Sequence, residues 1–197
     1  RVKSIAFDSS DETVKHYTNI CIISRTLLLN LINETLSRGN SHFIKDVLIP
    51  HISTLRIYGH KHEGYYEEMS SLQKYYDESM RFLNREIRDE VFRTASVYTK
   101  VKDSMPTRYG ENAVVKNALI ADGCTIEGEV YNSIIFRGVK VAKGAVVKNC
   151  VLMQNTIINE NASVNCIITD KNVIIRDRRN LSGCEVHPFF ISKGSVI

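Results

Sequence analysis

The second half of the chain repeats a short pattern of aliphatic and turn-forming positions. Each repeat begins with Asn and a small residue and continues with two aliphatic residues, and successive starts are 15, 17 and 16 residues apart. A period of this length indicates stacked coils. The four segments are residues 117–120 (Asn-Ala-Leu-Ile), 132–135 (Asn-Ser-Ile-Ile), 149–152 (Asn-Cys-Val-Leu) and 165–168 (Asn-Cys-Ile-Ile).

Further positions recur at fixed distances from these Asn residues. Turn formers come six residues later, aliphatic residues nine later, and residues that tolerate tight turns twelve later. The turn formers are Gly123, Gly138 and Asn155, and the aliphatic residues are Ile126, Val141, Ile158 and Ile174. The residues that tolerate tight turns are Gly144, Asn161 and Asp177. Short apolar stretches between turns describe the flat sides of a coil, and each side is buried only when coils stack.

These columns predict a parallel β-helix over residues 107–197. A helical interpretation fails because Val and Ile dominate and Gly or Asn recurs every few residues. An antiparallel sandwich is the competitor, but it requires no fixed Asn column. The small residues after each Asn suit a crowded interior corner. We therefore predict packing roles for three of the five cysteines, Cys124, Cys150 and Cys166.

The first half alternates predicted strands and helices. Residues 19–23 and 54–60 are expected to form strands, and residues 26–36 a helix that ends at Gly39. Residues 43–49 predict a short helical turn before Pro50. Ser70 or Ser71 is expected to cap a helix whose apolar residues recur between positions 72 and 83, and a short helix is expected over 85–92.

This alternation is typical of α/β folds, and so few strands indicate the tail of a larger sheet. We expect that α/β part over residues 1–104. The extended joint at residues 104–107 contains Pro106, and the β-helix domain is expected over residues 105–197.

Composition narrows the class of protein. The 197 residues are 43% hydrophobic and 24% charged, as in soluble globular proteins, and no apolar run is long enough for a membrane span. The net charge of +4 is spread evenly, without the basic footprint of a nucleic-acid binder. Five scattered cysteines without a CxxC pair argue against structural zinc and disulfides, and favour the cytoplasm.

Three clusters are candidates for chemistry. His60 and His62 have no third ligand nearby in the sequence, so we expect no metal site. The carboxylates at 67 and 68 precede a helix, where acids are stabilised by the positive helix end. Arg176, Arg178 and Arg179 follow the fourth coil and suggest either an anion site or a solvated turn.

Three stretches resemble a known enzyme family. Residues 41–50 (Ser-His-Phe-Ile-Lys-Asp-Val-Leu-Ile-Pro) resemble the Ser-His-Asp-Phe-Gly-Lys-Asp-x-Ile-Pro segment of the glucose-1-phosphate adenylyltransferases. Residues 63–72 (Glu-Gly-Tyr-Tyr-Glu-Glu-Met-Ser-Ser-Leu) resemble their Gly-Tyr-Trp-x-Asp-Val-Gly-Thr segment. Residues 106–110 (Pro-Thr-Arg-Tyr-Gly) resemble the start of their C-terminal domain. The similarity covers nearly the whole chain.

The resemblance implies a left-handed hexapeptide β-helix behind a nucleotidyltransferase domain of which residues 1–104 are a part. The family joins ATP and glucose 1-phosphate to give ADP-glucose and pyrophosphate, with Mg²⁺, for glycogen synthesis. Its members are tetramers, homomeric or heteromeric, regulated by small anionic metabolites. The nucleotide-binding Gly-rich loop of the family is absent here, so we interpret the chain, which begins at Arg1, as a fragment that binds no cofactor by itself.

The departures from the family pattern favour a non-catalytic, GlgD-type subunit that pairs with a catalytic one. The acid that holds the metal in the family corresponds to Glu68, one methylene longer, and the Val-Gly-Thr turn has become Met-Ser-Ser. A displacement of that size costs on the order of 100-fold in rate. Under the resemblance Gly64 and Tyr65 are the substrate-binding candidates.

Candidate effector residues also follow from the resemblance. Residues 168–172 (Ile-Thr-Asp-Lys-Asn) resemble a segment that carries an effector-contacting lysine in relatives, which points to Lys171 with Asp170 and Arg108. An ordinary surface lysine is the alternative. A truncated catalytic subunit is the alternative function. A hexapeptide acyltransferase would need a catalytic His, and the coil half offers His187 alone.

Overall fold

The computed structural model describes residues 1–5, 15–93, 97–99 and 101–197, which form two compact units, Arg1–Gly64 and Tyr65–Ile197. The predicted boundary between residues 104 and 105 lies inside the second unit, where the coils begin. The helices just before it belong to the same unit as the coils. That residues 1–104 are part of a larger nucleotidyltransferase domain stays a prediction.

The first unit is built on a helix and a helical turn. Helix α1 (Arg25–Ser37) begins where Ser24 Oγ accepts a hydrogen bond from the amide of Leu27, and the chain leaves it through Gly39 at φ 74°. The turn η1 (Phe43–Leu48) is a π-helix. Leu31 of α1 and Val47 of η1 are buried, so this unit has a small core of its own. Both helical predictions are confirmed.

The two strands predicted in the first half are wrong. Residues 19–23 and 54–60 have no regular secondary structure, and no strand occurs among the described residues before Arg108. The amide of Val2 donates a hydrogen bond to the carbonyl of Ile57, but within the described ranges no strand pairs with either segment. Local β propensity is insufficient because a strand needs a neighbour that takes up its backbone hydrogen bonds. The regular secondary structure of the described first half is therefore all helical.

Two helices open the second unit, as predicted. Helix α2 (Leu72–Arg81) is capped by Ser71, whose Oγ accepts from the amide of Lys74, and α3 (Arg85–Arg93) follows after a short turn. None of the described helices has the length and hydrophobicity that a membrane span requires.

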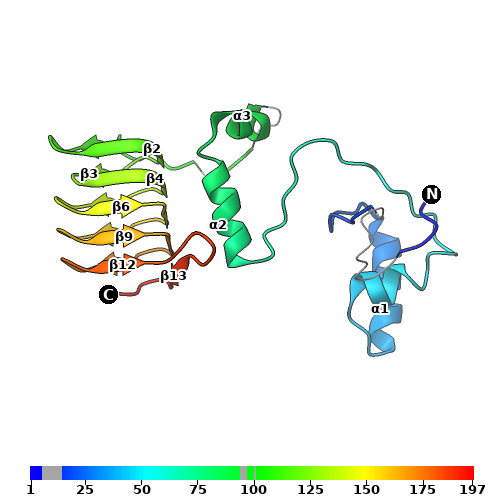
Figure 1. Cartoon of the computed structure of the whole chain (residues 1–197). Coiled ribbons are helices and arrows are strands. Elements are labelled where there is room, and N and C mark those ends of the chain that lie inside the picture. Colours follow the sequence, from blue (N-terminus) through cyan, green and yellow to red (C-terminus); the bar gives the residue numbers. More distant parts are fainter. Residues whose placement is uncertain (6–14, 94–96, 100) are drawn as a thin grey trace. The chain divides into compact units, whose positions relative to one another are not determined.

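The coils form a parallel β-helix, which confirms the predicted fold (Figure 1). One side is a sheet in the order β1-β3-β5-β8-β11, and the other two sides share a sheet in the order β12-β9-β6-β4-β7-β10-β13, with β2 on β4. The strands are β1 (Arg108–Tyr109), β2 (Val114–Ile120), β3 (Thr125–Ile126), β4 (Glu129–Ile135), β5 (Lys140–Val141), β6 (Val146–Lys148), β7 (Val151–Leu152), β8 (Ile157–Ile158), β9 (Ser163–Asn165), β10 (Ile167–Thr169), β11 (Ile174–Ile175), β12 (Asn180–Ser182) and β13 (Phe189–Ile191).

The register of the fourth coil differs from the prediction by one residue. Lys148 pairs with Asn165 and Val151 with Ile168, so Asn149 lies level with Cys166 rather than Asn165. Cys166 accordingly takes the left-handed conformation, at φ 50°, that Asn117, Asn132 and Asn149 take in the coils above. Ladder hydrogen bonds and the interior apolar column set this register, and they override the identity of the corner residue.

The same shift moves two later positions. Ile175, not Ile174, continues the buried column through Ile158, and Arg178, not Asp177, takes the positive φ seen at Gly144 and Asn161. With these corrections the offsets of six, nine and twelve residues hold in the fourth coil.

The coil interior is a continuous apolar column. Its fully buried members are Cys124, Ile126, Val130, Ile135, Val139, Val141, Val147, Cys150, Leu152, Ile158, Val164, Ile167, Val173 and Ile175. Cys166 is also buried, so the packing roles predicted for the three cysteines are confirmed. Burial raises the pKa of Cys150 to about 12, and so leaves it a thiol rather than a reactive thiolate near neutral pH.

Helix α2 lies against one side of the stack (Figure 1). Tyr76 is buried with Val151 and Ile168, and Tyr75 and Met80 pack beside it. The Tyr76 hydroxyl donates a hydrogen bond to the carbonyl of Asn149, at 2.8 Å. The coils therefore provide a rigid base for α2 and for the segment that leads into it.

Candidate functional site

Residues 64–71, which contain the predicted substrate and metal positions, lead directly into α2. Gly64 has φ 135°, a backbone conformation that residues with a Cβ rarely adopt. Tyr65 is half-buried, and its ring lies 6.1 Å from that of Phe82 between centroids. The Arg81 guanidinium lies 5.6 Å from the Tyr65 ring centroid. The tyrosine predicted to bind substrate is thus held by aromatic and cation–π contacts to the end of α2.

A buried carboxylate organises this segment. Glu78 is 2% exposed, and it accepts hydrogen bonds from the Tyr65 hydroxyl at 2.6 Å and from Arg81 Nη1 at 2.9 Å. Lys74 Nζ lies 3.3 Å from its other oxygen. The same two cations also bind Glu67, at 2.7 Å from Lys74 and 3.0 Å from Arg81. The network ties the extended segment to α2 at both Tyr65 and Glu67.

The network shifts the ionisation of its members. Burial alone would raise the pKa of Glu78, but hydrogen bonds from Tyr65, Arg81 and Lys74 outweigh it and lower that pKa. Partial burial and the hydrogen bond to Glu78 raise the pKa of Tyr65 to about 12. Glu78 is therefore an anion and Tyr65 a neutral donor at neutral pH.

Glu68 is the position that the resemblance assigns to the metal-holding acid. Its side chain is exposed, and its carbonyl accepts a hydrogen bond from the amide of Ser70 in the turn that precedes α2. Glu67, next to it, is the residue that pairs with Lys74 and Arg81. Among the described residues no three His, Cys, Asp or Glu side chains lie close enough to hold a metal. His60 and His62 are exposed.

The predicted effector residues fall at two separate places. Asp170 and Lys171 form the turn before β11, where Asp170 Oδ1 accepts from the amide of Lys171, at 2.6 Å. Arg108 lies in β1 and pairs with Thr125 of β3. Because β1 and β11 are opposite ends of one sheet, the structure does not bring Arg108 to Lys171. The pair at 170–171 lies nearer α2, since Asp170 adds to the effect of burial in raising the pKa of Tyr75.

Comparisons with known proteins show which proteins this chain resembles. A family model described as "GlmU-like, C-terminal hexapeptide" matches residues 102–186. "Glycogen biosynthesis protein GlgD" of Bacillus subtilis is 39% identical over 178 residues, which cover 90% of this chain and 52% of that protein. The chain is thus similar to GlgD over most of its length, and it shares a similarity to glucose-1-phosphate adenylyltransferases.

Two further relatives show a similar likeness over a shorter part of the chain. GlgD of Geobacillus stearothermophilus is 37% identical over 60% of this chain and 35% of its own length. The glucose-1-phosphate adenylyltransferase of Desulfitobacterium hafniense is 33% identical over 61% of this chain and 31% of its own length. The chain thus spans about half of the first relative, and about a third of these two.

The ion network around Glu78 was not predicted as a site. The spacing of Lys74, Glu78 and Arg81, at i, i+4 and i+7 on one helix, places their side chains on one face and was the available signal. Nothing in that spacing shows that Glu78 is buried or that Tyr65 and Glu67 reach it. Those contacts require the fold of the segment before α2.

We predict that the Glu78 network stabilises the second unit in a pH-dependent way. Glu78→Gln should lower its free energy of unfolding by about 1–3 kcal/mol at neutral pH, because hydrogen bonds to a buried charge are lost. The pKa of Glu78 is lowered on folding, so this contribution is complete above the ordinary glutamate pKa of about 4.3 and is lost as the pH falls below it. Thermal unfolding of both proteins across that range measures the difference.

Glu111→Gln is the matched control. Glu111 is exposed and makes no ion pair among the described residues of the second unit, so removing its charge should change stability little at any pH. A Glu78→Gln deficit that stayed constant down to low pH would contradict the assigned role of the Glu78 charge.

Proposed function

We propose that this chain is part of a non-catalytic, GlgD-like subunit that pairs with and modulates a catalytic glucose-1-phosphate adenylyltransferase in glycogen biosynthesis. The observation that carries the proposal is the state of residues 64–71. The position of the family's metal-holding acid is an exposed Glu68, one methylene longer than the family's aspartate, and Ser70 replaces the glycine of the turn that follows. GlgD similarity over 90% of the chain supports the same assignment.

The proposal assigns different work to the two parts of the second unit. The β-helix serves assembly and regulation, and the Glu78 network keeps residues 65–71 in a fixed conformation against α2. ATP, glucose 1-phosphate and Mg²⁺ are handled by the catalytic partner subunit. A hetero-tetramer of the two subunits is the expected assembly, and Asp170 and Lys171 are the predicted contacts for a small anionic effector. Five free thiols fit a cytoplasmic location.

The decisive experiment uses the complete protein and its catalytic partner from the same organism. ADP-glucose formation should be undetectable with the complete protein alone. Addition of that protein should change the activity or effector response of the catalytic subunit severalfold. The measurement is pyrophosphate release at fixed ATP, Mg²⁺ and glucose 1-phosphate, with and without candidate effectors.

Glu68→Ala separates the proposal from a catalytic alternative. In a non-catalytic subunit this substitution leaves the activity of the mixture unchanged, because Glu68 holds no reacting metal. Activity of the complete protein alone that disappears in Glu68→Ala would establish a catalytic subunit and overturn the proposal. Absence of any change on mixing would also overturn it.

A further inference from the structure

The turn at residues 176–179 departs from the turns that stack above it. Val141, Ile158 and Ile175 are aligned by strand pairing, as are Val146, Ser163 and Asn180 five residues later. The four residues in between therefore correspond one to one. In columns these are Ala142, Asn159 and Arg176; Lys143, Glu160 and Asp177; Gly144, Asn161 and Arg178; and Ala145, Ala162 and Arg179. Three Arg side chains thus replace small or amide residues.

Arg178 occupies its position at a conformational cost. Its φ of 58° matches the 72° of Gly144 and the 56° of Asn161, residue types that favour the left-handed region, whereas Arg does not. The amide of Arg178 donates to the carbonyl of Glu160, at 2.9 Å, as Asn161 does to Lys143 one coil above. The ladder therefore imposes the strained conformation, and residues kept under such strain concentrate at binding sites.

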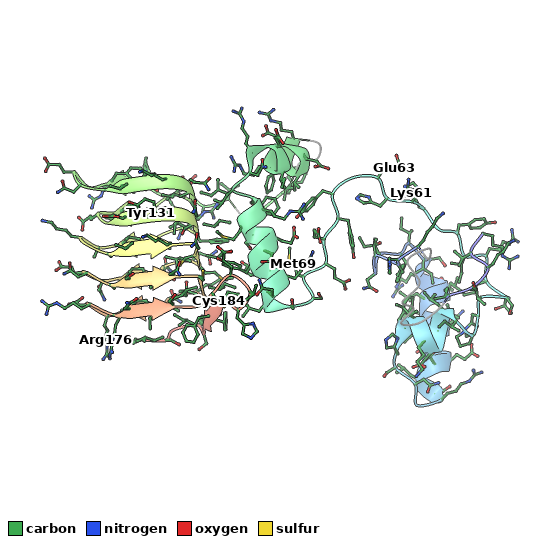
Figure 2. The ribbon with its side chains drawn as sticks, viewed as in Figure 1. Lys61, Glu63, Met69, Tyr131, Arg176 and Cys184 are labelled. Atoms are coloured by element: carbon green, nitrogen blue, oxygen red, sulfur yellow. The ribbon has the colours of Figure 1, made fainter. Side chains whose placement is uncertain are left out.

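The three guanidinium groups have no counter-charge within salt-bridge distance. Among the described residues, no ion pair involves Arg176, Arg178 or Arg179, and Asp177 in the same turn makes none either. All four side chains are exposed at the end of the stack, where Figure 2 shows Arg176. The turn therefore has a local charge of +2, from three Arg and one Asp.

This positive charge lies at one end of a corner that carries both positive and negative side chains elsewhere. The same corner of the β-helix carries Glu160 one coil higher, Lys143 two coils higher, and Glu127 and Glu129 three coils higher. At the lower end a hollow of about 510 Å³ is lined by Asn159 and the four residues of the 176–179 turn. The hollow is large enough for a small molecule, and its lining is mostly polar. The ligand that complements this lining is polar and anionic.

We propose that the 176–179 turn is a binding site for a small phosphate-bearing molecule. Guanidinium groups present paired N–H donors that match phosphate oxygens, and the Asn159 amide adds a neutral donor at the rim. Asp177 also lines the hollow. Its carboxylate repels negative charge on that side of the hollow, so the site suits a compact anion. The site is distinct from Asp170 and Lys171, and it stands independently of the proposed function.

The test is calorimetric titration of the chain with inorganic pyrophosphate and, separately, inorganic phosphate, at low ionic strength. Arg178→Asn removes one guanidinium and places in the turn the residue that Asn161 already provides, so folding is retained. We expect this variant to bind pyrophosphate at least about tenfold more weakly. Arg179→Ala, which restores the small residue of that column, should weaken binding to a similar extent.

Lys143→Gln is the matched control, and Lys171→Gln tests whether the anion binds instead at the predicted effector turn. Each removes one positive charge from an exposed turn of the same β-helix without touching the 176–179 turn. Wild-type affinity in both Lys variants, with weakened binding in the two Arg variants, supports the site. The proposal is overturned if the wild type binds neither anion, if all four variants lose affinity equally, or if Lys171→Gln alone abolishes binding.

Discussion

Replacing Ile158 by Ala should lower the free energy of unfolding of the β-helix by about 2–5 kcal/mol. Ile158 is completely buried in β8, in the interior column between Val141 and Ile175. Truncation removes apolar contacts with the interior and leaves a cavity that the coils above and below cannot close without breaking their ladder. Chemical denaturation followed by far-UV circular dichroism measures the loss.

The neighbouring residue of the same strand provides the control. Ile157 points to the opposite side of β8 and is half-buried, so Ile157→Ala removes the same atoms at lower cost, about 1 kcal/mol. Equal losses for the two substitutions would contradict the assignment of the interior side.

Replacing Gly128 by Ala should cost about 2–3 kcal/mol because the coils approach too closely there for a side chain. A Cβ at Gly128 would lie 2.7 Å from the carbonyl oxygen of Ala142 and closer still to that of Ala145, both backbone atoms of the next coil. A backbone atom cannot rotate aside as a side chain does. The coils must therefore separate, with loss of hydrogen bonds such as that from the Glu129 amide to Ala145. Denaturant unfolding again measures the effect.

Gly194→Ala separates steric exclusion from backbone strain. Gly194 has φ 73° but no atom within 4 Å of the added Cβ, so its substitution should cost only about 1 kcal/mol of strain. A loss at Gly128 no greater than that at Gly194 would show that the coils yield easily at this corner.

The repeat was predictable because a β-helix requires the same chemistry at the same place in every coil. The interior column and the corners at Gly123, Gly138 and Asn155 are visible in the sequence for that reason. Helix α2 and its Ser71 cap were predictable because capping and apolar spacing act over a few residues. Local rules of this kind do not extend to the strands expected at 19–23 and 54–60, which have no paired strand among the described residues.

The sequence by itself determined the coiled architecture, the helices and the family resemblance, since each rests on repeated or local patterns. Only the tertiary structure decided that Cys166 rather than Asn165 continues the corner column, because the register depends on hydrogen bonds to another coil. It alone decided that Glu78 is buried beneath Tyr65 and that Arg178 is held at positive φ. Burial and strain are set by neighbours distant along the chain, and these appear only when the coils have stacked.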